Sequence, residues 1–268
     1  KTIFATLMNE IKINTMKRLQ DNVTIITGGG KGIGFGMAQA FAREGSNLVI
    51  TGRNEGRLLE AKKRLEETYG VKVLALVADG ADENKIKEVI AKTVETFGKI
   101  NTLINNAQAS KSGLSLIEHS KEDFDLAINS GLYATFFYMR ESFPYLKESK
   151  GSVINFASGA GMYGKPGQSS YGAAKEGIRG LSRVAATEWG PDGVRVNIIA
   201  PLAMTESLSE WKDAYPELFA KTIQGIPLGR FADPMQDIGR VAVFLASDDA
   251  SYITGETITL QGGSGLRP

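Results

Sequence analysis

A glycine cluster between an apolar run and a helix-like segment constrains the fold of this chain more than any other feature. Residues 27–34 (TGGGKGIG) follow residues 23–26 (VTII), a run typical of a strand buried in a parallel sheet. The apolar side chains of residues 34–44 recur with the period of a helix. In a strand, glycine turn and helix, the backbone can approach a pyrophosphate, and the helix N-terminus attracts its negative charge. This context predicts a dinucleotide-binding unit, although a glycine cluster alone would be weak evidence.

The alternation of strand and helix continues along the chain. Strands are predicted over residues 23–26, 47–51, 72–77, 101–104, 151–157, 193–199 and 257–260. Helices are predicted over residues 34–44, 55–69, 83–97, 121–147 and 237–246, and around residues 169–175. One α/β domain with a doubly wound parallel sheet and helices on both faces accounts for this order.

Two segments stand outside this alternation. Residues 205–224 predict one or two short inserted helices, and such a segment beside a site, at about 203–225, is a candidate lid. Leu208, Trp211 and Leu218 would then offer apolar surface to a substrate, whereas the alternative is a surface helix pair whose aromatic side chains are core. The domain is expected over residues 16–268. Residues 1–15 are expected to be an upstream extension, a short docked helix or a remnant of expression.

Composition excludes several classes of function. The chain has 31 Lys and Arg against 30 Asp and Glu, so no global field recruits nucleic acid or an anionic membrane. It has no Cys and a single His, His119, which excludes thiol catalysis and the usual zinc sites; no metal is expected, and His119 is expected at the surface or as a cap. No apolar run approaches the ~20 residues that span a bilayer, and the first residues lack a secretory signal. We expect a cytoplasmic protein.

The chemistry is concentrated in residues 169–175 (SSYGAAK), which read as helix. Tyr171 and Lys175 stand four residues apart and share a helix face. A cation beside a Tyr stabilises the phenolate and lowers its pKa from about 10, so the pair can exchange a proton with an alcohol. The bare spacing also fits an ordinary surface pair. Ser158 favours catalysis because it follows a predicted buried strand, at the edge where open α/β sheets bind ligands.

Together these features resemble the short-chain dehydrogenase/reductase family, whose pattern is a TGxxxGxG turn, an NNAG-type strand end, a helix Asn, a Ser and YxxxK. The resemblance runs from about residue 16 to about residue 263 in the family's order and spacing. It implies a Rossmann fold and an oxidoreductase that interconverts a secondary alcohol and a ketone. The catalytic residues that it implies are Asn129, Ser158, Tyr171 and Lys175. In the family the Tyr is the acid/base, the Lys lowers its pKa and binds ribose, the Ser donates to the substrate oxygen, and the Asn holds a water beside the Lys.

The resemblance also implies a nicotinamide dinucleotide site. Its residues here are Gly28, Gly30, Lys31, Gly32, Ile33, Gly34, Arg53, Asp79, Gly80, Asn106, Ala107, Pro201 and Thr205, together with Tyr171 and Lys175. Asp79 would bind the adenine and Thr205 the nicotinamide carboxamide. Three positions depart from the family's pattern: Gly80 stands where a larger residue is usual, and Gln108 and Leu202 replace glycines. Gln108 is expected either to change backbone freedom beside the nicotinamide ribose or to reach into the cleft.

The end of the second predicted strand bears on the choice of cofactor. A dinucleotide fold that prefers NAD generally carries an acid there, which holds the ribose hydroxyls and would repel a 2′-phosphate. Residues 52–54 read GRN instead. Arg53 and Lys31 can both face that phosphate, and a guanidinium fork fits it well; the alternative is two solvated loop charges. We therefore expect NADP(H).

Four stretches are similar to the bacterial 12α-hydroxysteroid dehydrogenases, which act on bile acids. They are residues 105–113 (NNAQASKSG), 130–136 (SGLYATF), 201–205 (PLAMT) and 265–268 (GLRP). This resemblance implies a sterol or another apolar secondary alcohol as the small-molecule substrate, in lipid metabolism. The alternatives are a 3-oxoacyl-thioester reductase of fatty-acid metabolism and a non-catalytic NADP(H)-binding sensor, which typically loses the Tyr or the Lys. Family helices matching residues 121–147 and the Tyr171 helix build subunit interfaces, so we expect a homo-oligomer, a tetramer or a dimer.

Overall fold

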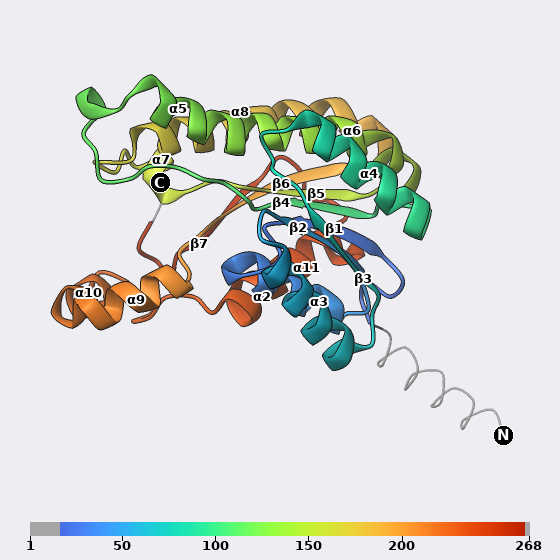
Figure 1. Cartoon of the computed structure of the whole chain (residues 1–268), viewed down its shortest axis with the longest axis horizontal. Helices are drawn as coiled ribbons and strands as arrows, with labels where there is room; N and C mark the ends of the chain where they lie inside the picture. Colours follow the sequence, from blue (N-terminus) through green and yellow to red (C-terminus); the bar gives the residue numbers. More distant parts are fainter. Residues whose placement is uncertain (1–16, 266–268) are drawn as a thin grey trace.

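The apolar runs of the sequence form a parallel sheet, as predicted. The computed structural model describes residues 17–265, and within this range seven parallel strands lie in the order β3-β2-β1-β4-β5-β6-β7 (Figure 1). Their bounds are β1 Val23–Thr27, β2 Asn47–Gly52, β3 Val73–Val77, β4 Thr102–Asn105, β5 Ser152–Phe156, β6 Arg195–Pro201 and β7 Thr257–Leu260. The doubly wound sheet is confirmed. The expected extension at residues 1–15 lies outside the described residues, as do residues 266–268.

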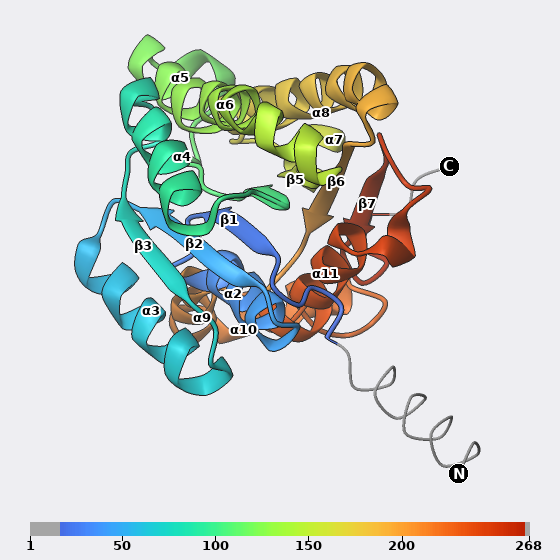
Figure 2. The same cartoon turned by 90° about the vertical axis from the view of Figure 1, so that its right-hand side faces the viewer.

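Helices cover both faces of the sheet (Figure 2). One face carries α2 (Gly32–Arg43), α3 (Glu55–Tyr69) and α11 (Arg240–Ala246), and the other carries α4 (Glu83–Phe97), α6 (Ala134–Ser149) and α8 (Ser169–Trp189). Side chains of β2 alternate between two apolar cores: Leu48 and Ile50 enter one core, and Val49 enters the other. Burial on both faces explains why the strands read as continuous apolar runs. Within residues 17–265, none of the helices is long and apolar enough to cross a bilayer.

Local capping explains why α3 and α4 begin and end where the sequence predicts. Asn54 Oδ1 accepts from Arg57 N at 2.9 Å before α3, and Asp82 Oδ1 accepts from Asn84 N at 2.9 Å before α4. Both helices end at a glycine in the left-handed conformation, Gly70 after α3 and Gly98 after α4. The signals are contained in the sequence, so both ranges are predicted to the residue.

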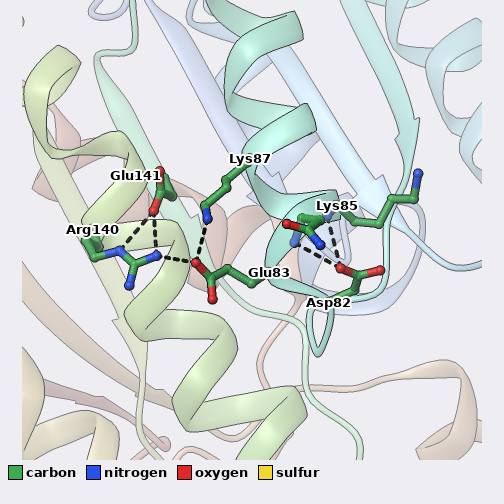
Figure 3. Close-up of polar contacts among 7 residues, drawn as sticks. Asp82, Glu83, Lys85, Lys87, Arg140 and Glu141 are labelled. Carbon is green, nitrogen blue, oxygen red and sulfur yellow. Dashed lines mark hydrogen bonds and ion pairs between the residues drawn. The ribbon is translucent and has the colours of Figure 1, made fainter.

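Charged side chains join α4 to α6 (Figure 3). Glu83 Oε1 of α4 lies 2.8 Å from Lys87 Nζ and 2.6 Å from Arg140 Nη2 of α6, and Arg140 also contacts Glu141. Hydrogen bonds from Lys87 and then Arg140 hold the pKa of Glu83 below its ordinary value. Exposed pairs of this kind contribute little to stability, so their effect is mainly to orient α4 against α6.

Helical residues run without a break from 121 to 149, as predicted, but the middle of this helix contains a wide turn that was not predicted. α5 (Lys121–Ala127) is followed by a π-helical segment, η2 (Ile128–Tyr133), before α6 begins. A second π-helical segment, η4 (Pro234–Gly239), precedes α11. Apolar periodicity cannot reveal a single wide turn, because the residues on each side of it keep their helical spacing. Such turns are frequent at functional sites, and Asn129 lies in η2.

The strand order reverses between β1 and β4, which pair directly with each other. The crevice outside the carboxyl ends of strands at such a reversal is where open α/β sheets bind ligands. The glycine turn follows β1 and Asn106 follows β4, so two of the predicted motifs meet there. The short helix α7 (Gly159–Met162) and the inserted helices α9 (Glu206–Ala214) and α10 (Pro216–Gln224) lie beyond the same end of the sheet (Figure 1).

Candidate active site

The glycine turn between β1 and α2 is shaped for close approach of its backbone. Gly28 has a φ of 68°, and a Cβ on Gly34 would lie 2.2 Å from the Gly28 carbonyl oxygen. Neither position accepts a side chain without strain. Gly30 is more tolerant, because a Cβ there would meet the flexible Leu58 side chain at 3.3 Å. The first turn of α2 has no side-chain cap and no acid, which leaves its N–H groups for an anion. The turn therefore fits a pyrophosphate.

Thr27 ties this turn to the end of β4. Its Oγ1 accepts from Asn106 N at 2.9 Å and from Ala107 N at 3.0 Å, and Asn106 Nδ2 donates to the Thr27 carbonyl at 2.9 Å. The structure thus brings the predicted Gly28, Asn106 and Ala107 together. Sequence reasoning missed Thr27 as a site residue. Its hydroxyl directly before the glycines, at the end of an apolar strand, is the signal that identifies it.

Lys31 lies in the turn after β1, and Arg53 directly follows β2, the strand that pairs with β1. Both residues are exposed. Within residues 17–265 neither forms an ion pair with an acid. Their charges are therefore open to an anionic ligand at this edge. Asp79 is also exposed, and its Oδ1 accepts from Ala81 N at 3.0 Å, which is the turn role that the sequence left open beside adenine binding.

Ser158, Tyr171 and Lys175 lie together near the carboxyl end of β5. Ser158 precedes α7 and its Oγ accepts from Ala160 N at 3.2 Å. The Ser158 side chain is close enough to the Tyr171 hydroxyl to lower its pKa. Lys175 Nζ lies 5.5 Å from the centroid of the Tyr171 ring, and the Lys175 residue is only 4% exposed. A phenol, a hydroxyl and an amine therefore lie in one corner, in which Lys175 is buried and Ser158 and Tyr171 are half-buried.

Burial sets the protonation of this corner. It raises the pKa of Tyr171, against the smaller lowering effect of the Ser158 side chain. Burial also lowers the pKa of Lys175 to about 7. The expected lowering of the Tyr171 pKa by Lys175 stays a prediction, because it requires the Lys175 amine to be protonated. The two groups are coupled, so a ligand that stabilises the ammonium also favours the phenolate.

Asn129 lies on η2, which packs against α8. The contact is close: a Cβ on Gly177 of α8 would lie 2.9 Å from Leu132 Cδ2 of η2. Asn129 and Lys175 are thus carried by adjoining elements. The Asn129 side chain is exposed, so water has access to it.

The segment after β6 forms two helices, as predicted. Pro201 ends β6, and Thr205 caps α9 by accepting from Leu208 N at 3.3 Å through its Oγ1. As an acceptor in this cap, the Thr205 hydroxyl keeps its proton for donation to a ligand.

Most apolar side chains of α9 and α10 pack on one another. Phe219 is buried, with its ring centroid 6.0 Å from that of Trp211 and 5.5 Å from that of Phe231. Leu208 belongs to the same cluster. Leu208 and Trp211 are half-buried and pack against this cluster, so the expectation that they present apolar surface to a substrate stays a prediction. Leu218 is 54% exposed and can still serve that purpose.

Comparison with known proteins identifies the family. The family model described as enoyl-(acyl carrier protein) reductase matches residues 28–264. A 12alpha-hydroxysteroid dehydrogenase from Clostridium sp. is 60% identical over 252 residues, which cover 92% of this chain and 97% of that protein. A 3-oxoacyl-[acyl-carrier-protein] reductase from Thermotoga maritima is 37% identical over 252 residues, with coverage of 92% and 98%. The crystal structure of levodione reductase matches with a TM-score of 0.86 at 33% identity, over 92% of this chain and 98% of that one.

The chain belongs to the short-chain dehydrogenase/reductase family. Its site is accordingly that of an oxidoreductase which acts on hydroxyl groups with a nicotinamide cofactor. Two departures from the short-chain dehydrogenase/reductase pattern meet at one place in this fold. Gln108 lies against Gly131 of η2, and a Cβ on Gly80 would lie 3.0 Å from Ala134 Cβ at the start of α6. The smaller residue at position 80 thus lets α6 approach the turn after β3.

Sequence reasoning missed a buried hydrogen-bond chain that supports α8 in this short-chain dehydrogenase/reductase. Asn105 Nδ2 donates to Asn155 Oδ1 at 2.8 Å, and Asn155 Nδ2 donates to Ser182 Oγ at 2.8 Å. The chain of bonds joins β4, β5 and α8. A lone Asn inside the apolar run 151–157 is the signal that predicts it, because a buried amide requires partners.

His119 fastens the loop after β4 to the start of α8. Its Nδ1 lies 2.9 Å from Ser169 Oγ and 3.2 Å from the Ser115 carbonyl oxygen. Ser169 is the first residue of α8, two positions before Tyr171. His119 is half-buried, and its contacts give it a structural role.

Proposed function

We propose that this chain is an NADP(H)-dependent dehydrogenase that interconverts the 12α-hydroxyl group of a bile acid and the corresponding ketone. The observation that carries the proposal is the Tyr171 hydroxyl, which lies close to the Ser158 side chain and beside the buried Lys175 amine. The substrate class is supported by the 60% identity to a 12alpha-hydroxysteroid dehydrogenase over nearly the full length of both chains. We place its activity in the cytoplasm and in lipid metabolism.

Each side chain has a role that its position supports. In oxidation, Tyr171 Oη takes the proton of the substrate hydroxyl while the carbinol C–H bond breaks with loss of hydride; reduction reverses both transfers. When bound, the nicotinamide accepts or supplies that hydride. Ser158 donates a hydrogen bond to the substrate oxygen. Lys175 stabilises the phenolate when its amine is protonated, and Asn129, on the adjoining η2, holds a water for proton exchange.

The residues around the crevice fit the dinucleotide. Gly28, Gly34 and the uncapped start of α2 would hold the pyrophosphate, and Asp79 the adenine. Gly32 and Ile33 begin α2 and Gly80 follows β3, and we infer that Pro201 and Thr205, at the end of β6 and just after it, would bind the nicotinamide carboxamide. Lys31 and Arg53, exposed and without acidic partners in residues 17–265, support selection of the 2′-phosphate of NADP(H).

Replacement of Arg53 by Asp should shift the cofactor preference toward NAD(H). The change removes a charge-assisted hydrogen bond, which contributes about 1.5–3 kcal/mol, and adds repulsion toward the 2′-phosphate. The ratio of kcat/KM for NADP+ to that for NAD+ should fall by about 10-fold or more. Lys63→Asp is the matched control, since Lys63 is exposed on α3 and changes the net charge equally. A wild type that uses NAD+ as efficiently as NADP+ would refute the assignment.

A homo-oligomer, a tetramer or a dimer, is supported by apolar side chains on the outer surface of η2, α6 and α8. Tyr133, Phe136 and Val184 are 50%, 37% and 55% exposed. The rings of Tyr133 and Phe136 both pack on Phe137, which gives this surface a rigid aromatic base. Contact with a second copy would remove this apolar area from water.

A 3-oxoacyl-thioester reductase is the second candidate, favoured by the 37% identity to such an enzyme from Thermotoga maritima. A non-catalytic sensor is less well supported, because Ser158, Tyr171 and Lys175 are all retained in one corner.

Initial rates with a panel of bile acids separate these proposals. Cholate and deoxycholate carry a 12α-hydroxyl, whereas chenodeoxycholate does not, and all three carry a 3α-hydroxyl. With NADP+ we expect oxidation of the first two and much slower oxidation of the third. Equal oxidation of all three bile acids would refute the 12α-hydroxysteroid proposal. If no bile acid is oxidised and NADPH reduces a 3-oxoacyl thioester, the proposal of a 3-oxoacyl-thioester reductase would replace it.

A further inference from the structure

We propose that Gln108 is a positioning residue, which holds the π-helical segment η2 in the conformation that places Asn129 beside α8. The proposal rests on the proposed function for the role of Asn129. Gln108 itself would touch neither the substrate nor the reacting atoms.

The Gln108 side chain turns from the end of β4 onto η2. Its Nε2 donates to the carbonyl of Ala127, the last residue before η2, at 3.4 Å. Its amide also lies flat against Gly131: a Cβ on Gly131 would lie 2.6 Å from Gln108 Cδ and 2.7 Å from Nε2. Gln108 therefore contacts the chain on both sides of Asn129. Gln108 and Gly131 are complementary, because the Gln108 side chain fills space that a side chain at position 131 would need.

Hydrogen bonds of Ser130 form a second contact between the loop after β4 and η2. Ser130 Oγ accepts from Ala109 N at 3.0 Å, and its proton is shared between the carbonyls of Ala109 at 2.9 Å and Leu126 at 2.6 Å. Gln108 and Ala109 thus contact residues 130 and 131, which follow Asn129. Gln108 also contacts residue 127, which precedes it. The other end of this loop is fixed to Thr27 through Asn106 and Ala107. Contacts are therefore continuous from the glycine turn to η2.

The π-helical geometry needs such support. A π turn is an uncommon, less favourable arrangement, and relaxation to an α-helix would rotate the residues on one side of it relative to those on the other. Asn129 lies inside the turn, so its direction depends on which geometry is kept. The arrangement has a cost: within residues 17–265, Gln108 Oε1 is buried without a hydrogen-bond partner. A buried polar atom left in this way is unfavourable.

Three variants test the proposal. Gln108→Gly removes the side chain, Gln108→Met keeps its volume without the donor, and Gly131→Ala displaces the amide from the other side. Hydrogen exchange by mass spectrometry would follow the amides of residues 128–134, and steady-state kinetics would follow kcat, the KM for the dinucleotide and the pH dependence of kcat. Gln236→Met is the matched control, because Gln236 is exposed on the other π-helical segment, η4.

We expect faster exchange in η2 for Gln108→Gly and Gly131→Ala, with Gln108→Met between them and the wild type. The same variants should lose about 10-fold to 100-fold in kcat, with a shifted pH profile, while the KM for the dinucleotide changes less than about 3-fold. The Gln236→Met control should match the wild type.

Unchanged exchange in η2 for both Gln108 variants would overturn the proposal whatever their activity. Faster exchange with a normal kcat would make Gln108 merely structural, and a raised KM at unchanged kcat would assign it to the cofactor loop; either result also overturns the proposal. A wild type inactive on bile acids would refute only the proposed substrate. Exchange does not depend on the substrate, and the kinetics would then use whichever alcohol or ketone the wild type converts.

Discussion

Tyr171→Phe should abolish turnover while leaving the dinucleotide site intact. The substitution keeps the ring against Lys175 Nζ and removes only the hydroxyl, whose pKa the Ser158 side chain lowers. Loss of a positioned acid/base costs about 10²-fold or more in rate. Because the glycine turn, Thr27 and Asn106 lie on other elements, the dissociation constant for the dinucleotide should change by less than about 3-fold.

The matched control for this variant is Tyr252→Phe, which removes a hydroxyl from a fully exposed tyrosine. Its kcat should equal that of the wild type. Steady-state rates and dinucleotide titration by fluorescence measure both quantities. A Tyr171→Phe enzyme with near-normal kcat would show that another group carries the proton.

Lys175→Met should remove activity yet make the protein more stable at low pH. Burial depresses the pKa of Lys175 from 10.5 to about 7, so the unfolded chain holds more protons than the folded one between about pH 7 and pH 10.5. Wild-type stability therefore rises with pH through this window, and below pH 7 the full cost of burying the charge is present. One pKa unit corresponds to 1.36 kcal/mol, so that cost is on the order of several kcal/mol.

A methionine of similar shape avoids this cost. The free energy of unfolding of Lys175→Met, measured by urea titration without added dinucleotide, should exceed that of the wild type most at pH 6 and progressively less toward pH 10. Lys92→Met is the control, because it removes an equal charge from an exposed position on α4 and should show no such pH-dependent gain. If the Lys175→Met protein is less stable than the wild type at pH 6, burial of the Lys175 ammonium does not destabilise the folded protein, and the prediction is refuted. The same variant should lose turnover by about 10²-fold or more, since the phenolate of Tyr171 loses its cation.

The features that were predictable from the sequence are those determined by neighbouring residues. The strands could be found because they are buried on both faces, and α3 and α4 could be delimited because Asn54, Gly70, Asp82 and Gly98 cap them locally. Most of the candidate site followed from motifs at strand ends, since the carboxyl ends of parallel strands share one edge. Gly28, Asn106, Ser158 and Tyr171 all lie near that edge.

What could not be predicted depends on contacts between distant parts of the chain. The wide turn at Asn129 is held by the loop after β4, which no local pattern encodes. The pKa of Tyr171 depends on how far the phenol and Lys175 are buried, which a motif alone does not reveal. Trp211 could be a lid residue or a core residue at the same helical spacing, and its contact with Phe219 appears only in the folded chain.

The central claim is that Tyr171 and Ser158 act on one carbinol of a bile acid, and the structure of the product tests it most directly. Cholate offers 3α-, 7α- and 12α-hydroxyls to the same enzyme in one reaction. After incubation of the wild type with cholate and NADP+, carbon-13 NMR of the isolated product locates the new carbonyl. The account predicts a 12-oxo product with the 3α- and 7α-hydroxyls intact. A carbonyl at position 3 or 7 would contradict it.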